Sequence, residues 1–170
     1  MKTNLNYDMF VPTRTLFGAG TLNELHAQPM PGRKALLVIS NGRSTRANSY
    51  LSRTEEQLRM AGVETVLFDR VEANPLKSTV MAGGAMAREN GCDMIVALGG
   101  GSVMDAAKAI AVVASNGGDY WDYIPCGTGK GKAVAETPLP IVAITTTAGT
   151  GSETDAGCVI TNAETHEKTG

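Results

Sequence analysis

The chain has 170 residues, of which 42% are hydrophobic and 19% charged, so it is long enough to bury the core of one domain. A formal net charge of -2 and 5% aromatic residues argue against a nucleic acid partner, because they offer neither a basic surface nor stacking platforms. No apolar run approaches the ~20 residues that cross a bilayer, and the first residues lack the apolar core of a signal peptide. Three cysteines without CxxC spacing are expected as free thiols, so the composition predicts a soluble, cytoplasmic protein with no membrane partner.

The first predicted elements are extended. Residues 9–11 and 13–17 form two short extended segments separated by Pro12, a pattern typical of an edge hairpin. The first buried strand is predicted at residues 35–39. A polar turn follows it at residues 40–44 and leads into a helix that ends near Gly62, a natural residue after a helix.

Strands and helices then alternate along the chain. The sequence predicts strands at residues 63–68, 95–98, 140–144 and 158–161, helices at 78–90 and 102–114, and a polar, glycine-rich surface excursion at 116–138. Buried strands that alternate with helices at this spacing predict a doubly wound, Rossmann-like α/β fold. Its parallel sheet is expected to carry helices on both faces.

The third of the strong apolar runs, residues 95–98, leads into a turn made only of glycine. Gly99, Gly100 and Gly101 would let the backbone approach a ligand closely and adopt φ > 0. Ser102 is expected to cap the next helix, with Asp105 reaching back toward the cap. Because a helix N-terminus has unpaired N–H groups and the positive end of the dipole, the turn predicts an anion site, and a phosphate is the obvious anion.

Two common nucleotide motifs do not fit. The glycine turn is not the G-x-G-x-x-G fingerprint, since Met104 stands where the third glycine belongs. Residues 127–132 are not a P-loop, because Gly131 follows Gly127 after three residues rather than four and Ala133 replaces the magnesium-binding Ser or Thr. We interpret that segment as a surface loop.

Three polar loops directly follow predicted strands, at residues 40–44, 99–102 and 145–152. In parallel sheets covered on both faces, ligands bind outside the carboxyl ends of the strands. The clustered hydroxyls of residues 145–152 could donate hydrogen bonds to a pyrophosphate, a ribose or a nicotinamide amide. The three loops together therefore predict a nucleotide site.

Two long motifs resemble the paired signature of the iron-containing (group III) alcohol dehydrogenases. They are Gly99-Gly100-Gly101-Ser102-Val103-Met104-Asp105 with Lys108, and Thr146-Thr147-Ala148-Gly149-Thr150-Gly151-Ser152-Glu153; Asn74-Pro75 and Glu164-Thr165-His166 with Lys168 are similar as well. The resemblance covers nearly the whole chain. It implies that residues 1–170 form the dinucleotide-binding domain of an oxidoreductase that interconverts a small primary or secondary alcohol and its aldehyde or ketone with NAD or NADP.

The resemblance also implies where the cofactor lies. It assigns Gly100, Gly101 and Ser102 to the pyrophosphate. It assigns Thr146, Thr147 and Thr150 to the nicotinamide half, with further cofactor-side positions at Asn74 and Lys168. The full set of candidate cofactor-binding residues adds those after the first buried strand and two from the glycine turn and its helix: Asn41, Gly42, Arg43, Ser44, Gly99 and Asp105.

The resemblance also exposes an absence. Members of this family continue into a helical second domain that supplies an Asp and typically three His ligands to a divalent metal, iron or zinc. Here His26 and His166 are the only histidines, and neither lies in an Asp-x-x-x-His helix. We therefore assign no metal ligand and no catalytic residue, and expect a metal only together with the missing second domain. Two alternatives remain: a relative such as a glycerol dehydrogenase or a dehydroquinate synthase, and a non-catalytic nucleotide-binding module. Turnover by the purified chain with added metal would separate the enzymes from the binding module.

Two further expectations concern cofactor preference and assembly. Family members that use NAD often place an Asp after the first strand, whereas residues 40–46 contain no acid. Arg43 could make a forked contact to a 2′-phosphate, so the sequence predicts NADP over NAD. An apolar surface left without its partner domain, together with an edge hairpin, predicts a homodimer or a larger homo-oligomer.

Overall fold

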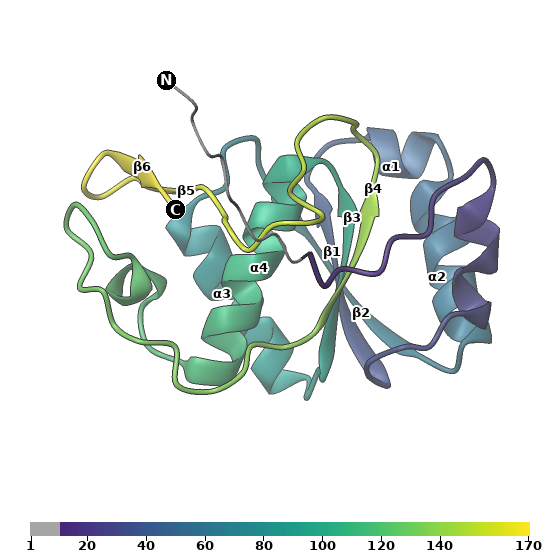
Figure 1. The fold of residues 1–170 in the computed structure, drawn as a ribbon, viewed down its shortest axis with the longest axis horizontal. Helices are drawn as coiled ribbons and strands as arrows, with labels where there is room; N and C mark the ends of the chain where they lie inside the picture. Colours follow the sequence, from purple (N-terminus) through teal and green to yellow (C-terminus); the bar gives the residue numbers. More distant parts are fainter. Residues whose placement is uncertain (1–10) are drawn as a thin grey trace, which may run out of the picture.

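A four-stranded parallel sheet with helices on both faces forms the body of the protein (Figure 1). The structure, a computed structural model, describes residues 11–170. The strand order is β2-β1-β3-β4, with β1 (Lys34–Ser40) and β3 (Met94–Gly99) at the centre and β2 (Glu64–Val71) and β4 (Ile141–Thr145) at the edges. The predicted Rossmann-like α/β fold is confirmed.

The central strands are apolar throughout because both of their faces are covered. In β1, Leu36 and Val38 pack into the core beneath α3 (Lys77–Glu89) and α4 (Gly101–Asn116). Leu37 and Ile39 point to the other face, where they meet the 3-10 helix η1 (Thr21–Ala27) and α2 (Tyr50–Met60). Figure 1 shows these two helical layers on opposite sides of the sheet.

The edges of the sheet correct two predictions. Residues 9 and 10 of the expected N-terminal hairpin lie outside the described residues, and residues 13–17 form no strand, so this half of the hairpin is wrong. Phe17 is 96% exposed, and residues 11–16 before it are exposed as well, so this part of the described chain buries no side chain. The expectation that β4 is buried is also wrong. Alternate residues of β4 are exposed, because Val142 and Ile144 pack against the apolar layer of η1 and α2 whereas the side chains on the other face of this edge strand join neither core cluster.

The connections differ in detail from the prediction. A short helix α1 (Ser44–Ala47) precedes α2, from which it is separated by Ser49 in a left-handed conformation (φ 58°). The excursion after α4 is not wholly on the surface, since the 3-10 helix η2 (Tyr120–Tyr123) buries Tyr120 and Trp121. The last predicted strand begins at Ile160 rather than residue 158. There β5 (Ile160–Asn162) pairs with an unpredicted antiparallel strand β6 (Glu167–Thr169).

Among residues 11–170 there is no helix with the length and apolar character that a membrane span requires.

Candidate cofactor-binding site

The glycine turn joins the end of β3 to the start of α4, with Gly100 between them in an extended conformation (φ −92°, ψ −168°). None of the three glycines has a positive φ, so their role is close approach rather than unusual backbone geometry. A Cβ on Gly100 would lie 2.9 Å from the Thr147 hydroxyl, and one on Gly101 would lie 3.2 Å from the Thr150 methyl group. Glycine is therefore required at both positions, because the loop after β4 (residues 146–152, the threonine loop) lies against the turn.

The start of α4 corrects the predicted capping box. The helix begins at Gly101, so Ser102 lies inside its first turn and makes no capping hydrogen bond. Asp105 does not reach back to the cap. Its carboxylate instead accepts hydrogen bonds from the Ser152 hydroxyl (2.6 Å) and from the Val159 backbone N–H (3.1 Å). No side chain therefore caps the first N–H groups of α4. A helix N-terminus with free N–H groups favours an anion.

Two cavities meet at this helix N-terminus, and both include Gly101 and Ser102. The first cavity, of about 460 Å³, is lined by Asn74, Pro75, Gly101, Ser102, Asp105, Thr150, Ser152, Asp155, Gly157, Cys158, Val159, Lys168 and Gly170. The second cavity, of about 450 Å³, is lined by Ser40, Asn41, Gly42, Ser44, Thr45, Glu72, Ala73, Gly99, Gly100, Gly101, Ser102, Val103, Thr146 and Thr147. Every candidate residue predicted from the sequence lines one of the two cavities, with the exception of Arg43.

The second cavity lies at the carboxyl ends of the strands, as the sequence predicted. Its walls are the loop after β1, the residues that follow β2, the glycine turn and the residues after β4. The threonine loop is tied to the turn by the Thr146 N–H, which donates to the Gly99 carbonyl (2.9 Å). Arg43 precedes α1 with an exposed side chain. Its neighbour Arg46 is paired with Asp69 (2.6 Å).

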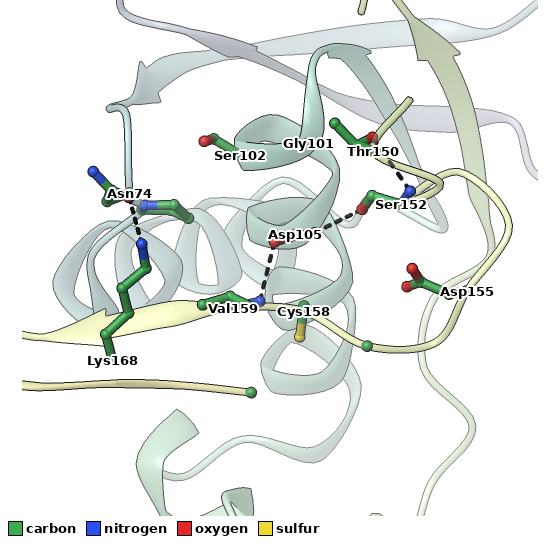
Figure 2. Close-up of a pocket in the computed structure, with 13 residues that line it drawn as sticks. Asn74, Gly101, Ser102, Asp105, Thr150, Ser152, Asp155, Cys158, Val159 and Lys168 are labelled. Carbon is green, nitrogen blue, oxygen red and sulfur yellow. Dashed lines mark hydrogen bonds between the residues drawn. The ribbon is translucent and has the colours of Figure 1, made fainter. Parts of the chain in front are cut away.

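One wall of the first cavity is a lysine–asparagine contact between distant segments. Asn74 follows β2 in a left-handed conformation (φ 57°), which is uncommon for a residue other than glycine. Its side-chain oxygen accepts a hydrogen bond from the Lys168 ammonium (2.7 Å), which comes from β6 (Figure 2). The hairpin formed by β5 and β6 is held in place by the Thr161 N–H, which donates to the Pro75 carbonyl (2.8 Å). The two residues that resembled family positions therefore lie together.

The opposite wall is the irregular segment between β4 and β5. Figure 2 shows Thr150, Ser152, Asp155, Cys158 and Val159 along it, next to α4. The Thr150 hydroxyl accepts a hydrogen bond from the Ser152 N–H (3.3 Å). Burial raises the pKa of the Cys158 thiol, and it also raises the pKa of the Tyr120 hydroxyl, 3.0 Å from that sulfur. Both groups are protonated at neutral pH, so Cys158 presents a neutral thiol rather than a nucleophilic thiolate.

The sequence did not single out several lining residues. Asp155 and Gly157 come from an irregular segment and carry no motif or periodic signal, and Val159 was predicted as part of a strand rather than of a site. Glu72 and Thr45 line the second cavity and were also missed. A signal for Glu72 was available, because it lies in the turn after the predicted strand at 63–68, at the end of the sheet where ligands bind.

Comparison with known proteins gives one family. Residues 12–170 match the family described as iron-containing alcohol dehydrogenase. The chain is 39% identical over 165 residues to the 1,3-propanediol dehydrogenase of Klebsiella pneumoniae, covering 95% of this chain and 41% of that protein. It is 38% identical over 165 residues to a probable NADH-dependent butanol dehydrogenase of Bacillus subtilis, covering 97% of this chain and 41% of that protein.

A solved structure gives the same result. The crystal structure of an NADH-dependent butanol dehydrogenase from Thermotoga maritima superimposes with a TM-score of 0.86 at 33% identity, covering 96% of this chain and 40% of that one. The chain thus spans about two fifths of the length of the relatives it matches. With the paired motifs, the parallel sheet and a family match over nearly all of its residues, the chain belongs to the iron-containing alcohol dehydrogenases.

Proposed function

We propose that this chain is the cofactor-binding part of an NAD(P)-dependent oxidoreductase that interconverts a small alcohol and its aldehyde or ketone. The observation that carries the proposal is the meeting of two cavities of similar size at the N-terminus of α4. A dinucleotide has two nucleoside halves joined by a pyrophosphate. The shared residues Gly101 and Ser102 supply the anion site between the two halves.

The proposal gives each half its own cavity. The adenosine half occupies the second cavity, because the loop after β1 is where an adenine ribose lies in a doubly wound sheet. The nicotinamide half then occupies the first cavity, with the Asn74–Lys168 pair on one side and Thr150 on the other. When bound, the nicotinamide supplies hydride transfer. The residues of the chain bind and orient the cofactor.

The substrate class is proposed from the relatives. The proteins to which the chain is similar carry the names of 1,3-propanediol and butanol dehydrogenases, which points to short primary alcohols ahead of glycerol or a more complex substrate. A glycerol dehydrogenase or dehydroquinate synthase activity is the second candidate. The substrate would have to approach the first cavity, where the nicotinamide is proposed to lie.

The residues described do not fit a metal ion. Among residues 11–170, no cluster of three or more His, Cys, Asp or Glu side chains could hold one. His26 Nδ1 is engaged with the Gln57 side chain (2.7 Å), and His166 is exposed in the turn between β5 and β6. We therefore derive no step through iron or zinc from this chain. We propose that the metal, together with catalysis, requires residues beyond this domain.

The preferred form of the cofactor is proposed to be NAD(H). Among the described residues that line the second cavity, Glu72 is the one with a charged side chain, and a carboxylate disfavours an additional phosphate. Arg43, on which the expectation of NADP rested, lies outside that lining. Relatives named as NADH-dependent support the same choice.

Titration of the purified chain with NADH, followed by nicotinamide fluorescence and calorimetry, tests the proposal. We expect saturable 1:1 binding, and no oxidation of 1,3-propanediol or butanol with NAD+ in the presence of added Fe²⁺ or Zn²⁺. Absence of binding would contradict the proposed function. Turnover by the chain would show that it carries its own catalytic residues and would contradict the assignment of catalysis to a further domain.

A further inference from the structure

The segment between β4 and β5, residues 146–159, contains neither helix nor strand, yet it forms one wall of the first cavity. The hydrogen bonds of a helix or a sheet therefore do not fix the position of this segment. Two side chains of α4, Asp105 and Lys108, lie one turn apart on the face of the helix that the segment crosses. Both bind it.

Lys108 makes three contacts with this segment. Its ammonium donates hydrogen bonds to the Ser152 hydroxyl (2.9 Å), to the Asp155 carboxylate (2.7 Å) and to the Gly157 carbonyl (2.7 Å). The Lys108 side chain is only 15% exposed, so its charge is largely withdrawn from water. An ammonium has three N–H donors, and each of them has an acceptor here. Lys108 consequently has no donor left with which to bind a ligand directly.

Ser152 connects the two side chains of the helix. Its buried hydroxyl accepts from Lys108 and donates to the Asp105 carboxylate, whose second oxygen accepts from the Val159 N–H. The contacts hold the segment at four points, residues 152, 155, 157 and 159. Figure 2 shows Asp105 between Ser152 and Val159, with the segment running along α4.

The contacts at Ser152 determine where Thr150 lies. The Thr150 hydroxyl accepts from the Ser152 N–H, and its methyl group sits over Gly101, where a Cβ would approach within 3.2 Å. Thr150 lines the first cavity, whereas the second cavity is bounded by the ends of the strands and by Thr146 and Thr147. A displacement of Ser152 would therefore alter the first cavity more than the second.

We propose that Lys108 is a positioning residue that holds residues 150–159 in place for the nicotinamide half of the cofactor and does not itself touch the cofactor. The proposal rests on the proposed function, because it assigns the first cavity to that half. It distinguishes Lys108, which lines neither cavity, from Lys168, whose side chain lines the first cavity. It also explains why the side chain is a lysine. Three acceptors around one nitrogen match an ammonium and not a planar guanidinium.

The test compares two ligands on the same variant. In Lys108→Met the stem of the side chain is kept and the three donors are lost. We expect calorimetry to show NAD+ binding at least tenfold weaker and ADP binding changed by less than threefold, because ADP lacks the nicotinamide half. Hydrogen exchange should rise in residues 146–159 and remain unchanged in β1 and β3. Lys34→Met is the matched control, since Lys34 is paired with Glu64 at the opposite end of the sheet (2.8 Å) and should affect neither ligand.

A second variant guards against a failure of Lys108→Met to fold. The Asp155 side chain is 55% exposed, so Asp155→Asn should fold, and it should weaken NAD+ about threefold with ADP unchanged. Equal weakening of NAD+ and ADP, an unchanged affinity for NAD+, or unchanged exchange in residues 146–159 would overturn the proposal. If the wild type binds neither ligand, the proposed function fails and the role of Lys108 falls with it. Failure of the Lys108 proposal alone is recognised by normal binding in the wild type.

Discussion

The two cavities that meet at the glycine turn are built in different ways. The walls of the second cavity are the ends of hydrogen-bonded strands and the turns that follow them directly. The first cavity is enclosed by an irregular segment and a two-stranded hairpin, which side-chain hydrogen bonds hold against α4 and Asn74. The shape of the second cavity therefore follows from the sheet, whereas that of the first depends on a few polar contacts.

This difference predicts a difference in local stability. The strands β1 and β3 that lead to the second cavity are buried almost throughout, and a segment of this kind opens only when the whole domain unfolds. Residues 153–157, which include Asp155 and Gly157 of the first cavity, are largely exposed, so they belong to the part of the chain that opens most readily. Substitutions in the sheet should therefore change the stability of the whole domain, whereas substitutions at the first cavity should change mainly its own ligand binding.

The largest expected effect is on the sheet. Leu37 is fully buried in the centre of β1, and Leu37→Ala should lower the free energy of unfolding by ~2–5 kcal/mol, the range for deleting buried methyl groups. The folded fraction should retain its affinity for NAD+, because Leu37 lines neither cavity. Urea unfolding followed by circular dichroism gives the stability. Met60→Ala, on the half-exposed last residue of α2, is the control, and equal losses for the two variants would refute the assignment of the core.

The next largest effect is expected at the junction that both cavities share. Gly100→Val would place a side chain where the pyrophosphate must approach. A Cβ at this position would lie only 2.9 Å from the Thr147 hydroxyl, so the valine would also crowd that residue. We expect NAD+ and ADP to bind about 100-fold more weakly, or ~2.8 kcal/mol at 1.4 kcal/mol for each tenfold change. Gly100→Ala should give a smaller loss. Calorimetric titration that finds equal affinities in the wild type and in Gly100→Val would disprove the placement of the pyrophosphate.

A third substitution affects only the first cavity. Lys168→Met removes the hydrogen bond to Asn74 and the positive charge on that wall. Hydrogen bonds to charged groups contribute ~1.5–3 kcal/mol, and an exposed lysine should lie at the lower end, so NAD+ should bind roughly tenfold more weakly. ADP binding should not change. Lys130→Met removes another exposed lysine, which is paired with Asp122 (2.8 Å) and lines neither cavity, and serves as the control. A loss of ADP affinity in Lys168→Met would mean that the two cavities are not separable.

The sequence predicted the second cavity better than the first, for a physical reason. The strands at 35–39 and 95–98 are continuous apolar runs, and the loops after them occupy the carboxyl ends by the geometry of a parallel sheet. Local pattern is enough to place Asn41, Gly99 and Thr146. It failed for Ser102 as the helix cap, because the helix starts one residue earlier, at Gly101.

The first cavity depends on contacts that no local pattern encodes. Asp105 and Ser152 are 47 residues apart, and Lys168 and Asn74 are 94 apart. The family resemblance supplied Asn74 and Lys168, but not Asp155 or the loop-holding role of Lys108. The exposed edge at β4 was missed for a similar reason, since its five apolar and small residues look the same whether or not a neighbouring strand covers them.

The exposed edge gives a smaller effect. The strand β4 has an unpaired outer edge among the described residues and no charged side chain, so we expect self-association through it at high concentration. Ala143→Lys places a charge on an exposed position in the middle of this strand. Like charges that face one another across paired strands cost up to about 1 kcal/mol, so the dimer dissociation constant should rise about fivefold. Light scattering measures it, and a monomeric wild type would contradict the expectation of a homo-oligomer.

The smallest effect distinguishes the two accounts of cofactor preference. If Arg43 binds a 2′-phosphate, Arg43→Ala should weaken NADP by ~1.5–3 kcal/mol and leave NAD unchanged, on the scale of a hydrogen bond to a charged group. In the structure the Arg43 side chain is exposed and does not line the second cavity, whereas Glu72 does. We therefore expect Arg43→Ala to change the affinity for either cofactor by less than twofold. Glu72→Gln should lower the ratio of NAD+ to NADP+ affinity severalfold, because it removes the negative charge and keeps the shape of the side chain. Parallel titrations with NAD+ and NADP+ measure both ratios. A selective loss of NADP binding in Arg43→Ala would restore the arginine as the determinant and reverse the proposed preference.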